Sequence, residues 1–160
     1  MKKIASFRID HTKLDIGIYV SRVDGYPLLR NVKATTFDIR VKKPYVDKQM
    51  DGNAMHTIEH LGASFLRSHR SGKNIIYFGP MGCATGFYLV AFLYEMDEES
   101  MVDIVKEMFK FIADFPKRHK TVPGATKKEC GNYRYHSLSK AAKIASDFLG
   151  RNEWRIKKYE

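Results

Sequence analysis

Two histidines and a glutamate close together in the sequence are the residues best suited to chemistry. His56 and His60 are four positions apart, and Glu59 immediately precedes the second histidine. On a helix, residues four apart lie on the same face about one turn from each other, so both imidazoles can bind one divalent metal. A carboxylate beside such a metal can take a proton from a bound water or substrate. The spacing therefore indicates a metal site, and a solvated helix face is the simpler alternative.

A third ligand is needed, because a catalytic metal site usually has three protein ligands and one open position. The sequence offers Cys83, Cys130, another histidine or a distant carboxylate. Cys130 follows a proline–glycine loop and precedes Gly131, so the backbone there can turn back toward the helix. Two imidazoles and a thiolate would suit Zn²⁺ or Fe²⁺. A free cysteine is also often a small buried hydrophobe, and that alternative stays open for Cys130.

Cys83 lies in a glycine-rich segment, residues 79–86 (GPMGCATG). Glycines on both sides let the backbone bend sharply and let a substrate approach the thiol. A nearby divalent cation would lower the pKa of this thiol, because the cation favours the thiolate. Cys83 could then act as a base or a nucleophile. The alternative is a tight turn between two strands.

The elements that must position these residues can be predicted from periodicity. Residues 54–68 carry apolar side chains at helical spacing, and His56, Glu59 and His60 fall beside that stripe. Asp51 or Asn53 could cap this helix, and Gly72 is a plausible stop. His56, Glu59 and His60 are therefore at the edge of the buried helix face, where a metal-binding cleft is expected.

Strands are predicted at residues 16–23, 35–41, 74–78 and 87–94. The last of these is apolar on both faces, so we expect it to be covered on both. Asp97 can cap a second helix that ends at about Phe115, before Pro116, and a third helix spans residues 139–149. Strands and helices intermix without regular βαβ alternation, which predicts an α+β sandwich with a largely antiparallel sheet.

Residues 6–12 contain no strong signal of either kind. We expect a short polar loop, or an edge segment with Phe7 and Ile9 turned inward.

The whole chain limits the class of protein. With 160 residues and 44% apolar content, it is expected to form one domain, residues 1–160. No run approaches the ~20 apolar residues of a membrane span, and the polar start of residues 1–5 does not predict a secretory signal. A cytoplasmic protein without a membrane partner is therefore expected, in which two cysteines serve metal or reactive roles more readily than a disulfide.

The formal net charge of +10 allows nucleic-acid binding, since Lys and Arg neutralise phosphates. The basic residues are scattered in small clusters, and no nucleic-acid motif accompanies them. A charge that serves solubility is the favoured interpretation.

Several motifs agree in their order along the chain. Residues 56–61 (HTIEHL), 79–88 (GPMGCATGFY) and 129–132 (ECGN) resemble the LuxS-type S-ribosylhomocysteine lyases, as do residues 6–11 (SFRIDH) and 37–40 (FDIR). Ala84 and Tyr77 depart from the family pattern, in which Arg or Gln often follows the cysteine and an acidic residue often replaces the tyrosine. These departures concern substrate contacts rather than the reaction.

The resemblance implies an α+β fold like that of the inverted zincins and a homodimer with two active sites at the subunit interface. It also implies one divalent metal per subunit, Fe²⁺ in the native enzyme, which Zn²⁺ or Co²⁺ often replaces. The implied metal ligands are His56, His60 and Cys130.

The resemblance further implies that Cys83 and Glu59 are the catalytic acid/base pair, and that the substrate is contacted from the partner subunit by Ser6, His11 and Arg40. The implied reaction cleaves S-ribosylhomocysteine to homocysteine and 4,5-dihydroxy-2,3-pentanedione, the precursor of autoinducer-2. It would serve the activated methyl cycle and quorum sensing.

Elementary chemistry agrees with this reaction. Breaking an unactivated thioether requires an acidic proton on the neighbouring carbon, so the sugar carbonyl must first migrate along the chain by enolisation. A metal can stabilise each enediolate, and each shift needs a base on one carbon and an acid on the next. The runner-up is an inverted-zincin metallopeptidase, a class with longer chains and a downstream glutamate as third ligand. A basic nucleic-acid-binding module is the third interpretation.

Overall fold

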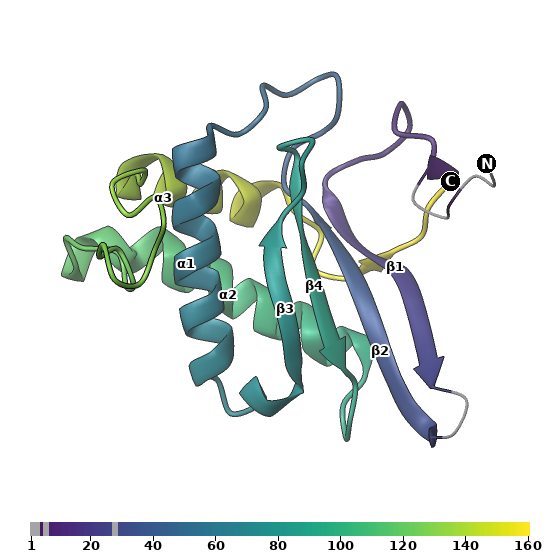
Figure 1. Ribbon diagram of the computed structural model, residues 1–160. Coiled ribbons are helices and arrows are strands. Elements are labelled where there is room, and N and C mark those ends of the chain that lie inside the picture. The colour runs from purple at the N-terminus through teal and green to yellow at the C-terminus, as the bar shows by residue number, and fades with distance from the viewer. Residues whose placement is uncertain (1–3, 5–6, 27–28) are drawn as a thin grey trace.

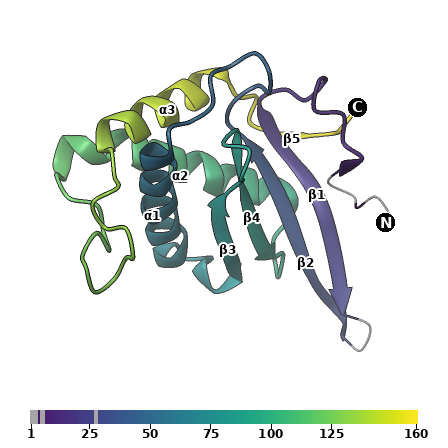
Figure 2. The ribbon, with the colours of Figure 1, turned by 45° about the horizontal axis from the view of Figure 1, so that its top comes forward.

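A five-stranded sheet and the helices packed against it make up the fold. The computed structural model describes residues 4, 7–26 and 29–160. The strand order is β3-β4-β2-β1-β5. Helix α2 lies behind the sheet, α1 packs beside β3, and α3 packs against α2 and α1, as Figure 1 and the rotated view in Figure 2 show. The predicted α+β fold with a largely antiparallel sheet is confirmed.

The strands are β1 (Gly17–Tyr26), β2 (Leu29–Arg40), β3 (Ile75–Pro80), β4 (Gly86–Phe92) and β5 (Ile156–Lys157). The first four pair antiparallel and correspond to the four predicted strands. The fifth pairs parallel with β1 and was not predicted. Two residues are too few for a periodic pattern, so only the tertiary contact defines this strand.

The helices are α1 (Gly52–Ser68), α2 (Glu98–Arg118) and α3 (Leu138–Arg151), with a short 3₁₀ helix η2 (Gly72–Asn74). The sequence predicted that α1 stops at Gly72. The helix instead ends at Ser68, and Gly72 begins η2. The prediction that α2 stops before Pro116 is also wrong. The missing N–H of Pro116 removes a single hydrogen bond in the last turn, and the helix closes with the His119 N–H donating to the Phe115 carbonyl at 3.0 Å.

The two candidate N-caps differ in what they do. The Asp97 carboxylate accepts a hydrogen bond from the Ser100 N–H at 2.8 Å and so caps α2. Asp51 precedes α1, but its side chain makes no capping bond and pairs instead with Lys140 of α3 at 2.7 Å. The start of α1 is therefore tied to α3 by an ion pair between side chains.

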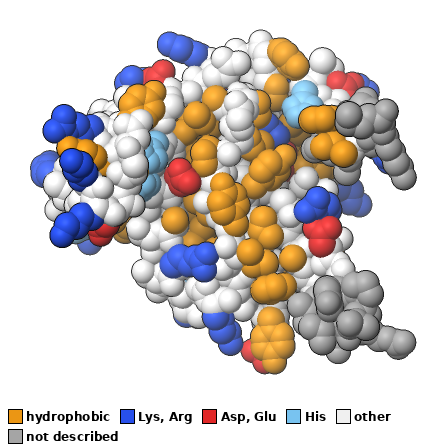
Figure 3. Space-filling model, in the orientation of Figure 1, with side chains coloured by type: hydrophobic (Ala, Val, Ile, Leu, Met, Phe, Trp, Pro, Cys, Tyr) orange, Lys and Arg blue, Asp and Glu red, His pale blue; other side chains and the backbone are white. Residues whose placement is uncertain are grey.

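One face of the sheet forms the core with the helices. Phe87, Leu89 and Ala91 of β4 are buried on that face. On the opposite face Tyr88 and Val90 are only partly buried and Phe92 is exposed. The expectation that β4 is covered on both faces is therefore wrong for the chain by itself, and Figure 3 shows hydrophobic side chains gathered on this open face.

The segment before β1 is a loop, one of the two predicted alternatives. Phe7 does not turn inward, because 67% of its surface is exposed, whereas Ile9 is partly buried.

Candidate metal centre and acid–base site

Helix α1 presents His56 and His60 on one face, with their ring centroids 4.6 Å apart. The Nδ1 atom of His56 lies 2.9 Å from the carbonyl oxygen of Tyr135, and that of His60 lies 2.8 Å from the carbonyl oxygen of Pro123. A carbonyl only accepts hydrogen bonds, so Nδ1 is the donor in each ring, and Nε2 is the nitrogen that remains to face a metal. Metal-binding histidines are commonly oriented in this way.

A loop after α2 brings Cys130 to the same place. Its Sγ atom lies 3.3 Å from Nε2 of His56, across 74 positions of sequence, and accepts a hydrogen bond from the Asn132 N–H at 3.4 Å. Gly124 shapes this loop with a φ of +72°, where a Cβ atom would lie 3.3 Å from Nδ1 of His60. Glycine is the residue that fits both the backbone conformation and the close approach.

His136 is a fourth member of the cluster that sequence reasoning missed. Its ring stacks on His56, with centroids 4.1 Å apart and planes 18° apart. The Thr57 hydroxyl donates to the Asn53 carbonyl and accepts from Nδ1 of His136 at 3.3 Å. This leaves Nε2 of His136 buried without a hydrogen-bond partner among the described residues.

The sequence pointed to His136 only as one of several unassigned histidines, because no spacing rule links it to α1. Burial, together with the neighbouring imidazoles of His56 and His60, lowers the pKa of His136 to about 4. The ring is therefore neutral at physiological pH, as a group facing a cation must be.

The ligand atoms of His56, His60, Cys130 and His136 all lie within 4.8 Å of one another. Imidazole nitrogens with one thiolate suit Zn²⁺ or Fe²⁺. The unpartnered Nε2 of His136 also fits a cluster whose polar atoms face a cation. No carboxylate belongs to the cluster within the described residues, which argues against the peptidase interpretation with its glutamate ligand.

Glu59 lies on α1 beside the two histidines and is partly buried. In the part of the chain that the structure describes, its carboxylate makes no hydrogen bond or ion pair. A carboxylate next to the cluster but without a partner can accept a proton from a bound molecule.

Cys83 is an exposed residue in the turn between β3 and β4, and its Sγ atom is partly buried against Thr85 and Arg40. The hydroxyl of Thr85 is 3.1 Å from Sγ, and the Arg40 guanidinium donates to Sγ at 3.5 Å. Burial would raise the pKa of this thiol, but the hydrogen bonds with Thr85 and the charge of Arg40 hold the pKa below its usual value. The sequence predicted that a nearby divalent metal would lower this pKa. The cation that contacts Sγ in this chain is the Arg40 guanidinium.

Arg40 is buried, with 1% of its surface exposed, and pairs with Asp38 at 2.5 Å. Burial would lower the pKa of Arg40, but the Asp38 carboxylate raises it above its usual value. The guanidinium also donates to the Thr85 hydroxyl at 2.6 Å. Within this chain, Arg40 contacts Cys83 and its neighbours.

His11 lines a cavity of about 410 Å³ together with Cys83 and Thr85. Its Nδ1 atom lies 3.0 Å from the carbonyl oxygen of Ile9. Ser6, the remaining predicted substrate contact, lies outside the described residues.

The site residues thus form two groups in one chain, of which His136, Thr85 and Asp38 were not predicted from the sequence. The metal group consists of His56, His60, Cys130, His136 and the adjacent Glu59, and the thiol group consists of Cys83, Thr85, Arg40, Asp38 and His11. No hydrogen bond between described residues joins a side chain of one group to a side chain of the other.

Comparisons with known proteins point to one family. The sequence model described as S-Ribosylhomocysteinase (LuxS) matches residues 4–159. The S-ribosylhomocysteine lyase of Borreliella burgdorferi (strain ZS7) is 48% identical over 150 residues, which cover 93% of this chain and 91% of the relative. The S-ribosylhomocysteine lyase of Desulfotalea psychrophila is 48% identical over 150 residues, covering 93% and 90%. That of Finegoldia magna is 45% identical over 149 residues, covering 93% and 90%.

Proposed function

This chain belongs to the S-ribosylhomocysteinase (LuxS) family and is a carbon–sulfur lyase, and we propose that it cleaves S-ribosylhomocysteine at a centre held by His56, His60 and Cys130. The products are homocysteine and 4,5-dihydroxy-2,3-pentanedione. The observation that carries the proposal is the convergence of these three ligand atoms, with His136, within 4.8 Å.

The proposed cofactor is one divalent metal per subunit, Fe²⁺ in the cell, with Zn²⁺ or Co²⁺ as substitutes. The backbone carbonyls that hold Nδ1 of His56 and His60 support this set, because they leave both Nε2 atoms free to bind. A bound divalent cation supplies Lewis acidity to the oxygens of the opened sugar.

Glu59 and Cys83 are the proposed proton-transfer groups. Each carbonyl shift removes a C–H proton from a carbon that bears a hydroxyl and returns a proton to the former carbonyl carbon, and the hydroxyl proton passes to the former carbonyl oxygen. Among the described residues Glu59 has no hydrogen-bond or ion-pair partner, so its carboxylate is available to a bound molecule, and the lowered pKa of Cys83 favours its thiolate. After the last shift, one of them takes the proton next to the carbonyl, and the homocysteine thiolate leaves from the adjoining carbon.

The proposal includes a homodimer with sites at the subunit interface, which Ser6, His11 and Arg40 reach from the partner subunit. Cys83 contacts Arg40 and lines a cavity with His11, so the subunit that supplies Arg40 and His11 to a site would also supply Cys83. One subunit would then supply the metal and Glu59, and the other the thiol group. The open face of the sheet, with exposed fractions of 50% for Tyr77 and 38% for Phe92, supports this assembly.

The product is the proposed precursor of autoinducer-2, which places the reaction in quorum sensing and the activated methyl cycle. A cytoplasmic location is also proposed, since reducing conditions keep Cys83 and Cys130 as the free thiols that both roles require. Among the described residues, no helix has the length and apolar character to cross a membrane.

The metal assignment predicts different metal contents for two single variants. Anaerobically purified protein should hold one metal per chain by elemental analysis, and Cys130→Ala should lose it because the only thiolate ligand is gone. His136→Ala should keep it, since His136 is not among the three proposed ligands. Stoichiometric metal in Cys130→Ala would remove Cys130 from the site, and loss of metal in His136→Ala would make His136 a ligand.

The catalytic assignment predicts that Cys83→Ala and Glu59→Gln each abolish turnover yet keep the metal. Each loses a proton-transfer group, a change that typically costs about 10²–10⁴-fold or more in rate. Release of thiol from S-ribosylhomocysteine measures the reaction directly. A near-normal rate in either variant would refute the role assigned to that residue.

A further inference from the structure

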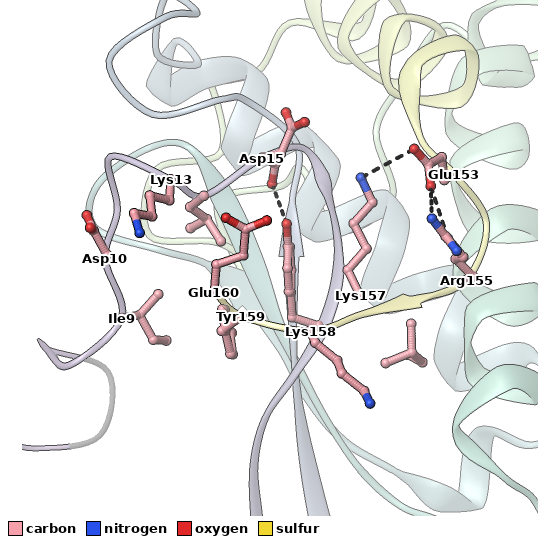
Figure 4. Close-up of a pocket in the computed structure, with 13 residues that line it drawn as sticks. Ile9, Asp10, Lys13, Asp15, Glu153, Arg155, Lys157, Lys158, Tyr159 and Glu160 are labelled. Atoms are coloured by element: carbon pink, nitrogen blue, oxygen red, sulfur yellow. Dashed lines mark hydrogen bonds and ion pairs between the residues drawn. The ribbon is translucent and has the colours of Figure 1, made fainter.

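The end of the chain folds back onto the edge of the sheet next to the thiol group. Ile156 and Lys157 pair in parallel with Ile18 and Tyr19 of β1, and Nζ of Lys157 donates to the Ile16 carbonyl at 2.8 Å. The tail after β5 lines a cavity of about 440 Å³ with residues 9, 10 and 13–15, and Figure 4 shows its labelled residues. The last residues are therefore a fixed part of the fold.

Tyr159 is held in this tail by two interactions. Its ring stacks on Tyr19 with centroids 4.8 Å apart and planes 9° apart. Its hydroxyl donates to Oδ2 of Asp38 at 3.2 Å, and Ser21 also hydrogen-bonds this hydroxyl. The hydroxyl of Tyr19 points elsewhere and donates to the Asp15 carbonyl at 3.1 Å. Of the two stacked tyrosines, only Tyr159 thus directs its hydroxyl to Asp38.

Asp38 is a buried carboxylate with few donors. Only 1% of its surface is exposed, its Oδ2 atom accepts from Arg40 and Tyr159, and its Oδ1 atom has no partner among the described residues. A buried charge depends strongly on each hydrogen bond that it receives. Among the described residues, Tyr159 is therefore one of two side chains that donate a hydrogen bond to this carboxylate.

The Arg40 guanidinium continues the chain of contacts to the reactive thiol. Its Nη2 atom donates to Asp38, and its Nη1 atom donates to Thr85 at 2.6 Å and to Sγ of Cys83 at 3.5 Å. Arg40 is therefore in contact with both the Asp38 carboxylate and the Cys83 thiol.

We propose that Tyr159 is a positioning residue for Cys83 and acts through Asp38 and Arg40. Its hydroxyl stabilises the negative charge of the Asp38 carboxylate by a hydrogen bond. The same bond holds the carboxylate in the orientation in which Oδ2 accepts from Arg40. Without that hydroxyl, Asp38 would draw Arg40 away from Sγ and leave more uncompensated negative charge near the thiolate. Both changes disfavour the thiolate. The relevance of this residue to turnover rests on the proposed role of Cys83.

Other charged and titratable groups also face this thiol and its partners. Besides Arg40 and Asp38 of β2 they are His11, Tyr45, Asp47 and Lys48 from the surrounding loops and Tyr88 of β4. A direct readout of the Cys83 thiolate is therefore needed, because an activity profile alone would include these groups.

The test compares Tyr159→Phe, which keeps the stacked ring, with the matched control Tyr19→Phe in the metal-loaded, full-length protein. The rate of Cys83 alkylation by iodoacetamide is followed against pH by mass spectrometry of the Cys83 peptide. Tyr159→Phe should react about threefold more slowly at neutral pH, with its midpoint at higher pH, and Tyr19→Phe should match the wild type. The acidic limb of the kcat/KM profile should move in the same direction as the alkylation midpoint.

An unchanged alkylation profile in Tyr159→Phe would overturn the proposal. So would a lower melting temperature without a shift of the profile, because the tail would then be only structural. Activity in Cys83→Ala is a separate result: it would refute the catalytic role of the thiol and leave the alkylation measurement valid. The two failures are therefore distinguishable.

Discussion

At the scale of single residues, Thr85 is predicted to control the protonation of Cys83. Its hydroxyl contacts both Sγ and the Arg40 guanidinium. The thiolate is the charged form, so removing a hydrogen-bond partner disfavours it and raises the pKa of the thiol. Thr85→Val should therefore be alkylated more slowly at neutral pH, by about threefold to tenfold, and reach its full rate at higher pH.

The control for that prediction is Thr121→Val, which makes the same chemical change at an exposed position. Alkylation rates of Cys83 measured from acidic to alkaline pH give the midpoint in each variant. Equal midpoints in Thr85→Val and the wild type would show that Thr85 does not stabilise the thiolate.

The functional residues that could be predicted from the sequence make contacts between positions close together in the chain. Those that could not be predicted make contacts between positions far apart in the chain. His56 and His60 share a helix face, a geometry that local periodicity determines. His136, Asp38 and the tail strand β5 gain their roles from contacts across the fold, which no local pattern encodes. The sequence predicted that a divalent metal would lower the pKa of Cys83, whereas the Arg40 contact that contributes to the lowered pKa joins residues 43 positions apart.

At the scale of elements, Gly62 is predicted to set how closely α1 packs against its neighbours. A Cβ atom there would meet the Phe78 ring of β3 within 3 Å and Sδ of Met108 of α2 at 3.1 Å. Alanine usually favours a helix over glycine by about 1 kcal/mol. Overpacking in a buried contact costs about 1–3 kcal/mol, so Gly62→Ala should lower the free energy of unfolding.

Gly150 of α3 provides the matched control, because a Cβ atom there meets nothing within 4 Å. Gly150→Ala should raise the free energy of unfolding by up to about 1 kcal/mol. Denaturant titration of both variants measures the two changes. Stabilisation of similar size in both would show that α1 and β3 can separate enough to admit a methyl group. Such a separation would also move the helix that carries His56 and His60.

At the scale of the whole molecule, the proposed homodimer, in which one subunit supplies the metal group and the other the thiol group, predicts a shared active site. Under the proposed assignment, Cys83→Ala keeps the metal ligands and Glu59, whereas Glu59→Gln keeps the thiol. In a mixed dimer with sites across the interface, one site combines both defects and the other combines both intact halves. Two inactive variants should therefore regain activity when their subunits are exchanged.

Random exchange of equal amounts makes about half of the dimers mixed, and each mixed dimer has one intact site out of two. The thiol-release assay should then recover about a quarter of the wild-type activity. Mixing Cys83→Ala with Cys83→Ala,Glu59→Gln is the control, since no pairing of those chains supplies the thiol. If the first mixture stays as inactive as the control after exchange has been verified by mass spectrometry, each site must lie within a single chain. In that case Cys83 must move to the metal group by a rearrangement of the β3–β4 turn, because the two groups share no side-chain hydrogen bond among the described residues.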